Sequence, residues 1–507
     1  MVTRRTIRAL VMTGGVLSGA LGLHSASAED GPTTQELLNK MKAMEQRIQS
    51  LEKQLEQRGA TPPPGTLAAP AGAAPAVVPA TAAVPQPMVQ VAPTATPAAV
   101  NKDLFGLMPS PIEGLRLGAY GELKFGTLQN PDHNGQWQTG FDAARLVLLP
   151  TYQFTDSIIF NAEIEFEHAG IGVDADDKLA GTAEIEQLYI DFKISPYFNL
   201  RSPGIDLVPV GYINQHHEPT LFYSVNRPEL ANRLVPTTWA PPATGFYGKI
   251  LDDLGYQVQF SSSLEDFGSG FDARTDGNTP APFPTGYAPG IDGKNALSFA
   301  KPPRGDFRQL SNAIATAVRL NYTPPIIPGL AGNSSVYFTP NTTPRNAYSD
   351  TGTPLHHSNL TLIDSELRYR MPGTGFEARG EYVQVFFGNP GSLRANNDSD
   401  PTNNVGRTMW GISGEVAYHF PIGRFLGSAW EAVPFYRYTY ENLQTGGFSG
   451  TDANTPIGAG QLQFHTMGVA VYPTPQLVLK LTYEKVIDRE HGGAKSDSVL
   501  GGVGFHF

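Results

Sequence analysis

The sequence predicts an all-β protein, an antiparallel transmembrane β-barrel of about 16 strands, with a short α-helical coiled coil and a Pro/Ala-rich spacer before it. Three observations predict this fold. Apolar and polar residues alternate from about Leu115 to Phe507, short turns alternate there with long polar loops, and charges of both signs stand in mid-strand. The segments are taken below in chain order.

Residues 1–28 have the pattern of a secretory signal peptide. A basic start is followed by an apolar stretch and a small-residue cleavage site, in the order Arg4, Arg5 and Arg8, then 9–23, then Ala26-Ser27-Ala28. The apolar stretch is too short to cross a membrane as a helix. We therefore predict export from the cytoplasm.

Residues 29–59 predict a coiled-coil helix in the periplasm. Apolar residues recur there at alternating spacings of four and three: Leu37, Met41, Met44, Ile48, Leu51 and Leu55. That repeat buries its apolar stripe best against other helices, most simply the same helix of sister chains, although packing on the chain's own barrel would also cover it. Residues 60–100 are almost entirely Ala, Pro, Val and Thr, which predicts an extended linker.

Residues 101–507 form the predicted barrel domain, where the period is two. Leu477, Leu479 and Leu481 alternate with Lys480 and Thr482, for example. The long polar stretches lie at 128–139, 168–183, 215–243, 264–309, 340–358, 388–407, 442–463 and 488–496. Short turns with Pro or Gly separate them, among them 150–156, 195–204 and 421–427. Short turns at one end and long loops at the other are typical of outer-membrane barrels.

Ionic side chains occupy one face of the predicted strands, where a packed interior would rarely hold them. The candidate lumen-wall charges are Glu163, Glu165, Asp364, Arg368, Arg379, Glu381, Arg437 and Lys480. A water-filled lumen accommodates such charges, and each of them could equally form an ion pair that stiffens the wall. At the end of the chain, Phe505 and Phe507 share a face of the last strand and resemble the signal that the barrel-insertion machinery reads.

The composition excludes several classes of protein. The chain has no Cys and a formal net charge of −11, so a disulfide scaffold, a thiolate metal site and a nucleic-acid partner are not expected. No Gly-x-Ser-x-Gly elbow, His-Glu-x-x-His pair or phosphate loop occurs, and we predict neither an enzyme nor a cofactor. His356, His357 and Asp364 are the one group that could be combined into a catalytic site, with nothing to fix their geometry.

A stretch from Val210 to Gly248 resembles the phosphate-selective porin (O and P) family. Its motifs are Gly211-Tyr212-Ile213-Asn214-Gln215, His216-His217-Glu218-Pro219 and the acidic-arginine segment 226–233, and those at 142–146 and 186–191 resemble other strands of that family. The coiled coil with its spacer resembles trimeric members thought to take up dicarboxylates. The resemblance implies a sixteen-stranded trimeric barrel in a Gram-negative outer membrane, constricted by its third loop.

The third loop is then 215–243, and its candidate constriction-lining residues are His216, His217, Glu218, Arg227, Glu229 and Arg233. His216 and His217 would either make the pore sensitive to pH near neutrality or anchor the loop through hydrogen bonds. The expected function is passive diffusion of small hydrophilic or ionic solutes, and the alternative is a structural protein that tethers the membrane to the cell wall through the coiled coil. Outer-membrane lipid, lipopolysaccharide and the insertion machinery are the other expected partners.

The charge balance departs from that family's pattern. Of 36 Lys and Arg residues 8 precede position 101, and of 47 Asp and Glu residues 6 do, which leaves 28 basic against 41 acidic groups in the barrel segment. A pore selective for phosphate requires cationic groups at close quarters, and no ladder of lysines is visible. The sequence therefore predicts neither selectivity for phosphate nor a preference for cations.

Overall fold

The structure, a computed structural model, describes the barrel and the loops close to it. The described residues are 114–130, 135–169, 181–265, six positions between 291 and 300, 313–342, 357–396, 405–446, 460–489 and 494–507. The predicted signal peptide, coiled coil and linker lie outside these residues.

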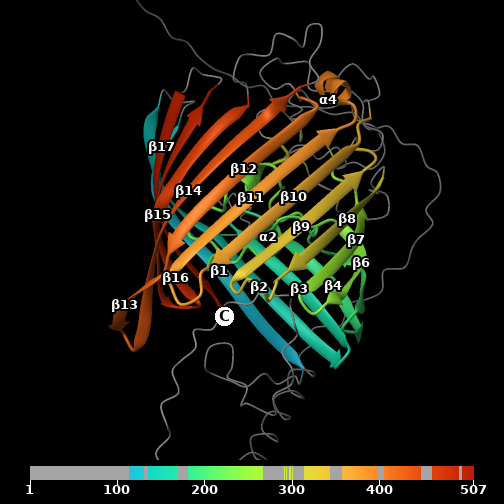
Figure 1. The fold of residues 1–507 in the computed structure, drawn as a ribbon, viewed down its shortest axis with the longest axis horizontal. Helices are drawn as coiled ribbons and strands as arrows, with labels where there is room; N and C mark the ends of the chain where they lie inside the picture. Colours follow the sequence, from blue (N-terminus) through green and yellow to red (C-terminus); the bar gives the residue numbers. More distant parts are fainter. Residues whose placement is uncertain are drawn as a thin grey trace, which may run out of the picture. The chain divides into compact units, whose positions relative to one another are not determined.

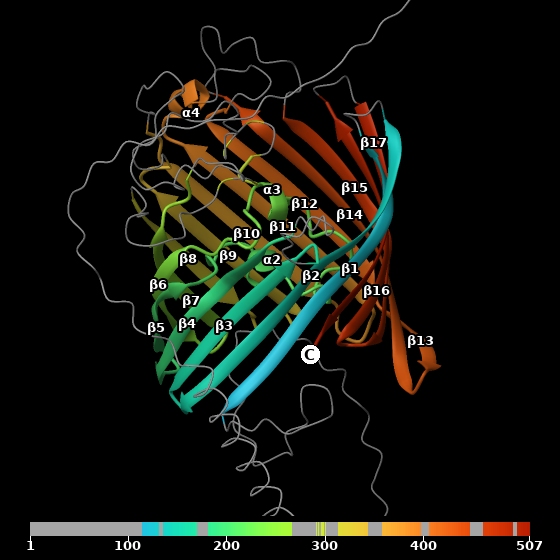
Figure 2. The ribbon, with the colours of Figure 1, turned by 180° about the vertical axis from the view of Figure 1, so that it is seen from behind.

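The described strands form one closed antiparallel β-barrel (Figures 1 and 2). Except for β12 and β13, each strand pairs with the next along the chain, and β1 also pairs with β17, which closes the ring. β12 and β13 follow one another against the same partner, β14, and so make one strand of the barrel. The ring therefore has 16 strands, and the fold predicted from the sequence is confirmed.

The strands are Leu115–Asn130 (β1), Gln136–Thr155 (β2), Ile158–Glu167 (β3), Ala183–Ser195 (β4), Phe198–Ile205 (β5), Pro242–Leu251 (β6), Leu254–Ser262 (β7), Ile314–Tyr322 (β8), Leu330–Thr339 (β9), Leu360–Arg370 (β10), Phe376–Phe387 (β11), Thr408–Tyr418 (β12), Phe420–Phe425 (β13), Ser428–Thr445 (β14), Gln461–Thr474 (β15), Leu477–Asp488 (β16) and Ala494–His506 (β17). The described helices are Tyr212–Gln215 (α2), Leu230–Arg233 (α3) and Pro390–Asn396 (α4). Among the described residues, no helix has both the length and the apolar character that crossing a membrane requires.

The predicted alternation of short and long connections is present. The turn between β2 and β3 holds only Asp156 and Ser157, whereas 206–241 separate β5 from β6. Three turns are shorter than the sequence predicts, because 150–155, 198–204 and 421–425 belong to strands. Gly204 explains one of these errors: a Cβ at this position would overlap the backbone oxygen of Leu188, so the glycine serves close strand approach and not a turn.

The two faces of the barrel differ in polarity as the period of two predicts. Large apolar side chains such as Leu123, Phe125 and Leu481 are exposed on the outer face. Acidic and basic side chains such as Glu163 and Arg437 are buried on the inner face. This is the inverse of a protein that folds in water, and it fits a wall between lipid and a polar interior.

The last strand closes the barrel at its edge with β1. Ala119 and Phe507 exchange two backbone hydrogen bonds of 2.9 and 2.8 Å. The rings of Phe505 and Phe507 stack with centroids 6.3 Å apart, and Phe507 is exposed. Both aromatic side chains stand on the outer face, as expected for the terminal residues of a barrel.

Candidate functional site

Residues 206–241, which we call loop 3, join β5 to β6 and turn into the barrel. Figure 2 shows α2 and α3, both part of this loop, inside the ring of strands. The two arms of the loop are tied together by Asn214, whose Nδ2 donates to the Val208 carbonyl and whose Oδ1 accepts from the Trp239 amide, both at 2.9 Å. Hydrogen bonds within loop 3 therefore hold its two arms in a defined conformation.

The first anchor of loop 3 is His217. Its Nε2 lies 3.4 Å from Oε1 of Glu163 on β3 and 3.6 Å from Oε2 of Glu186 on β4. All three side chains are buried. Burial lowers the pKa of His217, but the two carboxylates raise it well above its ordinary value. In the absence of another cation, His217 is therefore an imidazolium between two carboxylates.

The second anchor is Glu229, which accepts hydrogen bonds from three residues of the opposite wall. Nε and Nη2 of Arg437 donate to its two oxygens at 2.9 Å each, and the hydroxyls of Thr439 and Thr466 donate at 2.8 Å. Arg437 is also bonded to Glu415 at 2.9 Å. Burial raises the pKa of Glu229, but the Arg437 guanidinium lowers it more, to about 2.

Further wall residues hold the loop all around the barrel. These hydrogen bonds are Tyr212 N to Glu366 at 2.6 Å, Arg319 to the Gly211 carbonyl at 2.9 Å, Arg379 to the Leu221 carbonyl at 3.0 Å, Lys480 to the Ser224 carbonyl at 2.9 Å, Val225 N to Thr482 at 2.9 Å and Arg233 to Glu441 at 2.7 Å. These donors and acceptors come from β8, β10, β11, β14 and β16. The loop is therefore fixed to opposite sides of the ring.

Glycines on the inner wall let loop 3 approach the strands closely. A Cβ at Gly504 of β17 would lie 2.5 Å from the Cβ of Pro219, and one at Gly411 of β12 would overlap the side chain of Leu230. Both glycines stand where loop 3 crosses the wall. Larger residues would push the loop toward the middle of the lumen.

One side of the lumen is dry. Residues of loop 3, of 291–300 and of the inner faces of β8 to β12 form a buried apolar cluster that includes Leu230, Leu234, Trp239, Leu297 and Leu362. The alternation of residues in the sequence predicts a lumen lined by charges and does not reveal this cluster. It fills part of the barrel with packed side chains, so the space open to water lies elsewhere.

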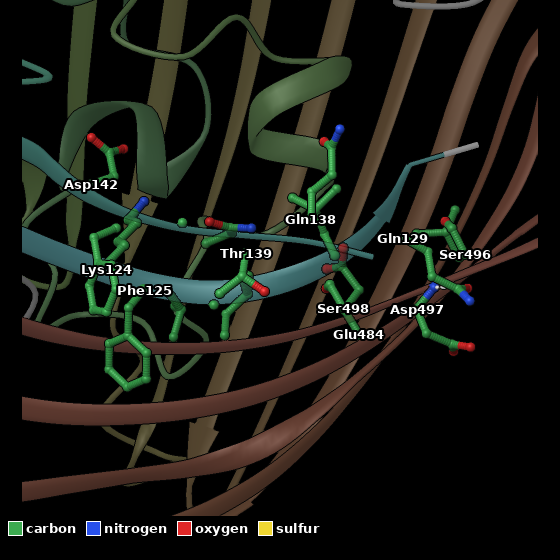
Figure 3. Close-up of a pocket in the computed structure, with 18 residues that line it drawn as sticks. Lys124, Phe125, Gln129, Gln138, Thr139, Asp142, Glu484, Ser496, Asp497 and Ser498 are labelled. Carbon is green, nitrogen blue, oxygen red and sulfur yellow. Dashed lines mark hydrogen bonds between the residues drawn. The ribbon is translucent and has the colours of Figure 1, made fainter. Parts of the chain in front are cut away.

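A cavity of about 610 Å³ lies on the other side of loop 3. Val225 and Asn226 of the loop border it, together with the long-loop ends of β1, β2, β16 and β17. Figure 3 shows polar side chains around it, among them Lys124, Gln138 and Asp142. Lys124 forms an ion pair with Glu122 at 3.0 Å, and Asp142 contacts Nδ1 of His168 at 2.9 Å. Loop 3 therefore leaves a cavity of mixed polar and apolar lining beside the wall.

The six predicted lining residues all lie in loop 3, but they do not form one cluster. His217 and Glu229 anchor the loop to different walls, and Arg233 bonds Glu441. The ring of His216 packs against Tyr212 with centroids 4.8 Å apart, and burial lowers its pKa to about 3. That these residues line a constriction stays a prediction.

Arg227 differs from the other charged residues of loop 3. Its side chain is 4 % exposed, and none of its three guanidinium nitrogens has a hydrogen-bond partner in the part of the chain that the structure describes. Glu218, next to His217, also has one buried oxygen without such a partner.

The predicted wall charges are mostly paired. Glu165 lies 3.5 Å from Arg145, Arg368 bonds Glu377 at 2.9 Å, and Asp364 accepts from Ser335 at 3.4 Å. Glu381 belongs to an acidic group with Asp364 and Glu366. Of the group His356, His357 and Asp364, for which the sequence fixes no geometry, His357 contacts the side chain of Asn341 at 3.2 Å, and His356 lies outside the described residues. Sequence reasoning missed Glu186, Glu441 and Arg319, all of which hold loop 3.

Comparison with known proteins finds one relative in sequence and several solved structures of low similarity. No protein-family model matches the sequence. An uncharacterized protein of Aquifex aeolicus strain VF5 is 26 % identical over 374 residues, which are 73 % of this chain and 75 % of that protein.

Three solved structures have low similarity to this fold. The anion-selective porin from Comamonas acidovorans is 12 % identical, with a TM-score of 0.45 over 78 % of this chain and 99 % of its own. The outer-membrane channel DcaP of Acinetobacter baumannii is 12 % identical, with a TM-score of 0.44 over 78 % and 97 %. Salmonella typhi OmpF, in complex with daunomycin, is 9 % identical, with a TM-score of 0.46 over 78 % and 97 %.

Proposed function

We propose that this protein is an outer-membrane porin of a Gram-negative bacterium, through which small hydrophilic or ionic solutes diffuse passively past loop 3. The observation that carries the proposal is loop 3 itself. It is anchored inside a barrel with a charged inner face, and it leaves a cavity of about 610 Å³, lined by both polar and apolar residues, against one wall. A barrel of 16 strands is the size that encloses an aqueous channel.

The polarity of the barrel supports a membrane location. Exposed Leu, Phe and Ile side chains on the outer face would be a liability in water, whereas lipid solvates them. The periplasmic position of the N-terminal segment, insertion by the barrel machinery through Phe505 and Phe507, and contact with lipopolysaccharide are parts of the proposal. A homotrimer is proposed from the apolar repeat in 29–59.

Conductance of the purified protein in planar lipid bilayers tests the proposal. We expect stable single-channel steps, and well-folded protein that gives no steps would refute it. Reversal potential across a salt gradient then gives the sign of selectivity. Asp142→Asn is the variant to compare, because Asp142 borders the cavity and its loss should shift selectivity away from cations.

The proposal does not specify which solute permeates the channel. No family model supports the resemblance to phosphate-selective porins, and the sequence of the barrel segment shows no ladder of lysines. A role for the coiled coil as a tether to the cell wall is compatible with a channel. Deletion of residues 29–100 separates the two roles, because a channel keeps its conductance and a tether loses its envelope phenotype.

A further inference from the structure

We propose that Glu163, Glu186 and His217 bind one divalent transition-metal ion that fixes loop 3 to the wall of β3 and β4. The two carboxylates belong to neighbouring strands, and the imidazole belongs to the loop. All three are at most 3 % exposed. Their ligand atoms converge, since Nε2 of His217 and one oxygen of each carboxylate lie within 4.8 Å of one another.

The spacing fits a metal better than it fits direct hydrogen bonds. Tetrahedral zinc sites with bonds of about 2.0–2.2 Å hold their donor atoms about 3.3–3.6 Å apart. The separations from His217 Nε2 to Glu163 and Glu186 are 3.4 and 3.6 Å, beyond the usual length of an N–H···O⁻ bond of about 2.7–2.9 Å. Both oxygens of Glu186 and the Nε2 atom lack a hydrogen-bond partner among the described residues.

A hydrogen bond orients the imidazole for metal binding. Nδ1 of His217 lies 3.1 Å from the carbonyl oxygen of Asn214, which can only accept, so Nδ1 carries a proton. In a neutral ring the lone pair of Nε2 then points at the two carboxylates. Metal-bound histidines commonly have this arrangement, with the other ring nitrogen bonded to a backbone carbonyl.

The Glu163 carboxylate is held by two donors of the wall. The Tyr120 hydroxyl donates to Oε1 at 2.7 Å, and the Gln187 amide donates to Oε2. The ring of Tyr120 also contacts that of His217 edge-on, with centroids 5.7 Å apart. These contacts fix the ligand atoms before any ion arrives, which reduces the cost of binding.

A β-bulge brings Glu186 into the cluster. Glu163 pairs with Gln187 and Ile164 pairs with Ile185, so Glu186 is an extra residue in β4. The bulge turns both Glu186 and Gln187 to the side where they meet Glu163 and His217. A regular strand would leave Glu186 on the face of Leu188, which is exposed on the outer surface.

The donor set selects the class of ion. One imidazole nitrogen and two carboxylate oxygens suit Zn²⁺, with Mn²⁺ as the oxygen-preferring alternative, and the two negative charges balance a divalent ion. Calcium and magnesium bind mainly through oxygen and are expected to compete poorly. In the metal-free protein, a proton on His217 takes the place of the ion.

Metal binding to the folded, detergent-solubilised full chain tests this inference. The protein is dialysed against a chelator, titrated with Zn²⁺ or Mn²⁺ against a chromophoric competitor, and analysed for bound metal by mass spectrometry. We expect one ion per chain for the wild type. Binding should fall at least 100-fold in Glu186→Gln and His217→Gln, which keep side chains of similar size.

The matched control is Glu441→Gln. Glu441 is also buried on the wall and also holds loop 3, through Arg233, but it lies outside the cluster. It should keep wild-type metal affinity and the same heat-modifiable migration on gels. Zn²⁺ should raise the melting temperature of the wild type and of this control, and leave that of Glu186→Gln unchanged.

Two results would overturn the inference. One is wild-type protein that binds no Zn²⁺ or Mn²⁺ after chelator removal, which leaves His217 as a protonated anchor. The other is binding that is unchanged in both cluster variants, which would place the ion at other histidines. The titration of the wild type decides the question even when a variant does not fold. Metal binding at equilibrium does not depend on conductance, so this test and that of the proposed channel fail separately.

Discussion

Replacement of Arg437 by Met should loosen loop 3 from its wall. Arg437 is 2 % exposed and donates four hydrogen bonds, two to Glu229, one to Glu415 and one to Ser224. Met fills a similar volume and donates none. The variant therefore leaves Glu229 without its cation and with only the hydroxyl donors of Thr439 and Thr466, whereas Glu415 keeps its ion pair with Arg379 at 3.6 Å.

The size of the effect follows from this loss. Removal of one partner from a buried ion pair costs about 3–5 kcal/mol. The ratio of detached to anchored loop should then rise by roughly 10² to 10³·⁵, at about 1.4 kcal/mol for each tenfold change. The anchor at His217 remains, so we expect only the part of the loop around Ser224 and Glu229 to be released.

Single-channel recording detects this release. The variant should show brief transitions to higher conductance and a lower midpoint of heat denaturation on gels. Arg368→Met is the control, because Arg368 bonds Glu377 on the neighbouring strand. If Arg437→Met gave traces and a midpoint equal to those of the wild type, the anchoring role assigned to the Arg437–Glu229 pair would be wrong.

Three further predictions concern packing, pH and the unpaired guanidinium. Gly504→Ala should cost about 1–3 kcal/mol by crowding loop 3, whereas Gly414→Ala, with open space around its Cβ, should be close to neutral in the same heat-denaturation assay. The pKa of Glu229 is held near 2, below its ordinary 4.5, so the stability of its ion pair is complete above pH 4.5 and is lost as the pH falls toward 2. Since burial lowers the pKa of His216 to about 3, its ring stays neutral from pH 8 to 5, and His216→Gln should leave the pH dependence of conductance in that range unchanged; a step between pH 6 and 7 that this variant abolishes would contradict this. Arg227→Gln should raise the melting temperature, because it removes a buried charge without hydrogen-bond partners among the described residues, and an unchanged or lower value would indicate a partner in a solute or loop.

The fold could be predicted because the period of two persists through almost every strand. The errors lie at Pro203, Gly204 and Pro421, which were interpreted as turn residues and stand in strands. In β5 and β13 these residues accompany shifts of register, where a missing amide proton or side chain is tolerated. Sequence composition alone cannot separate a bulge from a turn.

The position of loop 3 was predictable, and its contacts were not. Glu229 meets Arg437 across 208 residues of sequence, and only closure of the ring brings them together. Glu186 was missed because a strict period of two places it with Leu188 on the outer face, and the bulge reverses that assignment. Leu360 and Leu362 share the inner face of β10 with Asp364, so the period of that strand does not reveal that one half of its face is covered by a dry cluster.

The two faces of the final strand, β17, contact different surroundings. Its outward residues Phe505 and Phe507 meet the membrane, while on its inward side His506 bonds Thr220 of loop 3 at 2.8 Å and Gly504 closely approaches Pro219. Loop 3 comes from the first half of the chain, and β17 is the strand that pairs with β1 to close the ring. The seam of the barrel is therefore also a contact surface for loop 3, so a defect in the packing of this loop would reach the strand pair that seals the ring.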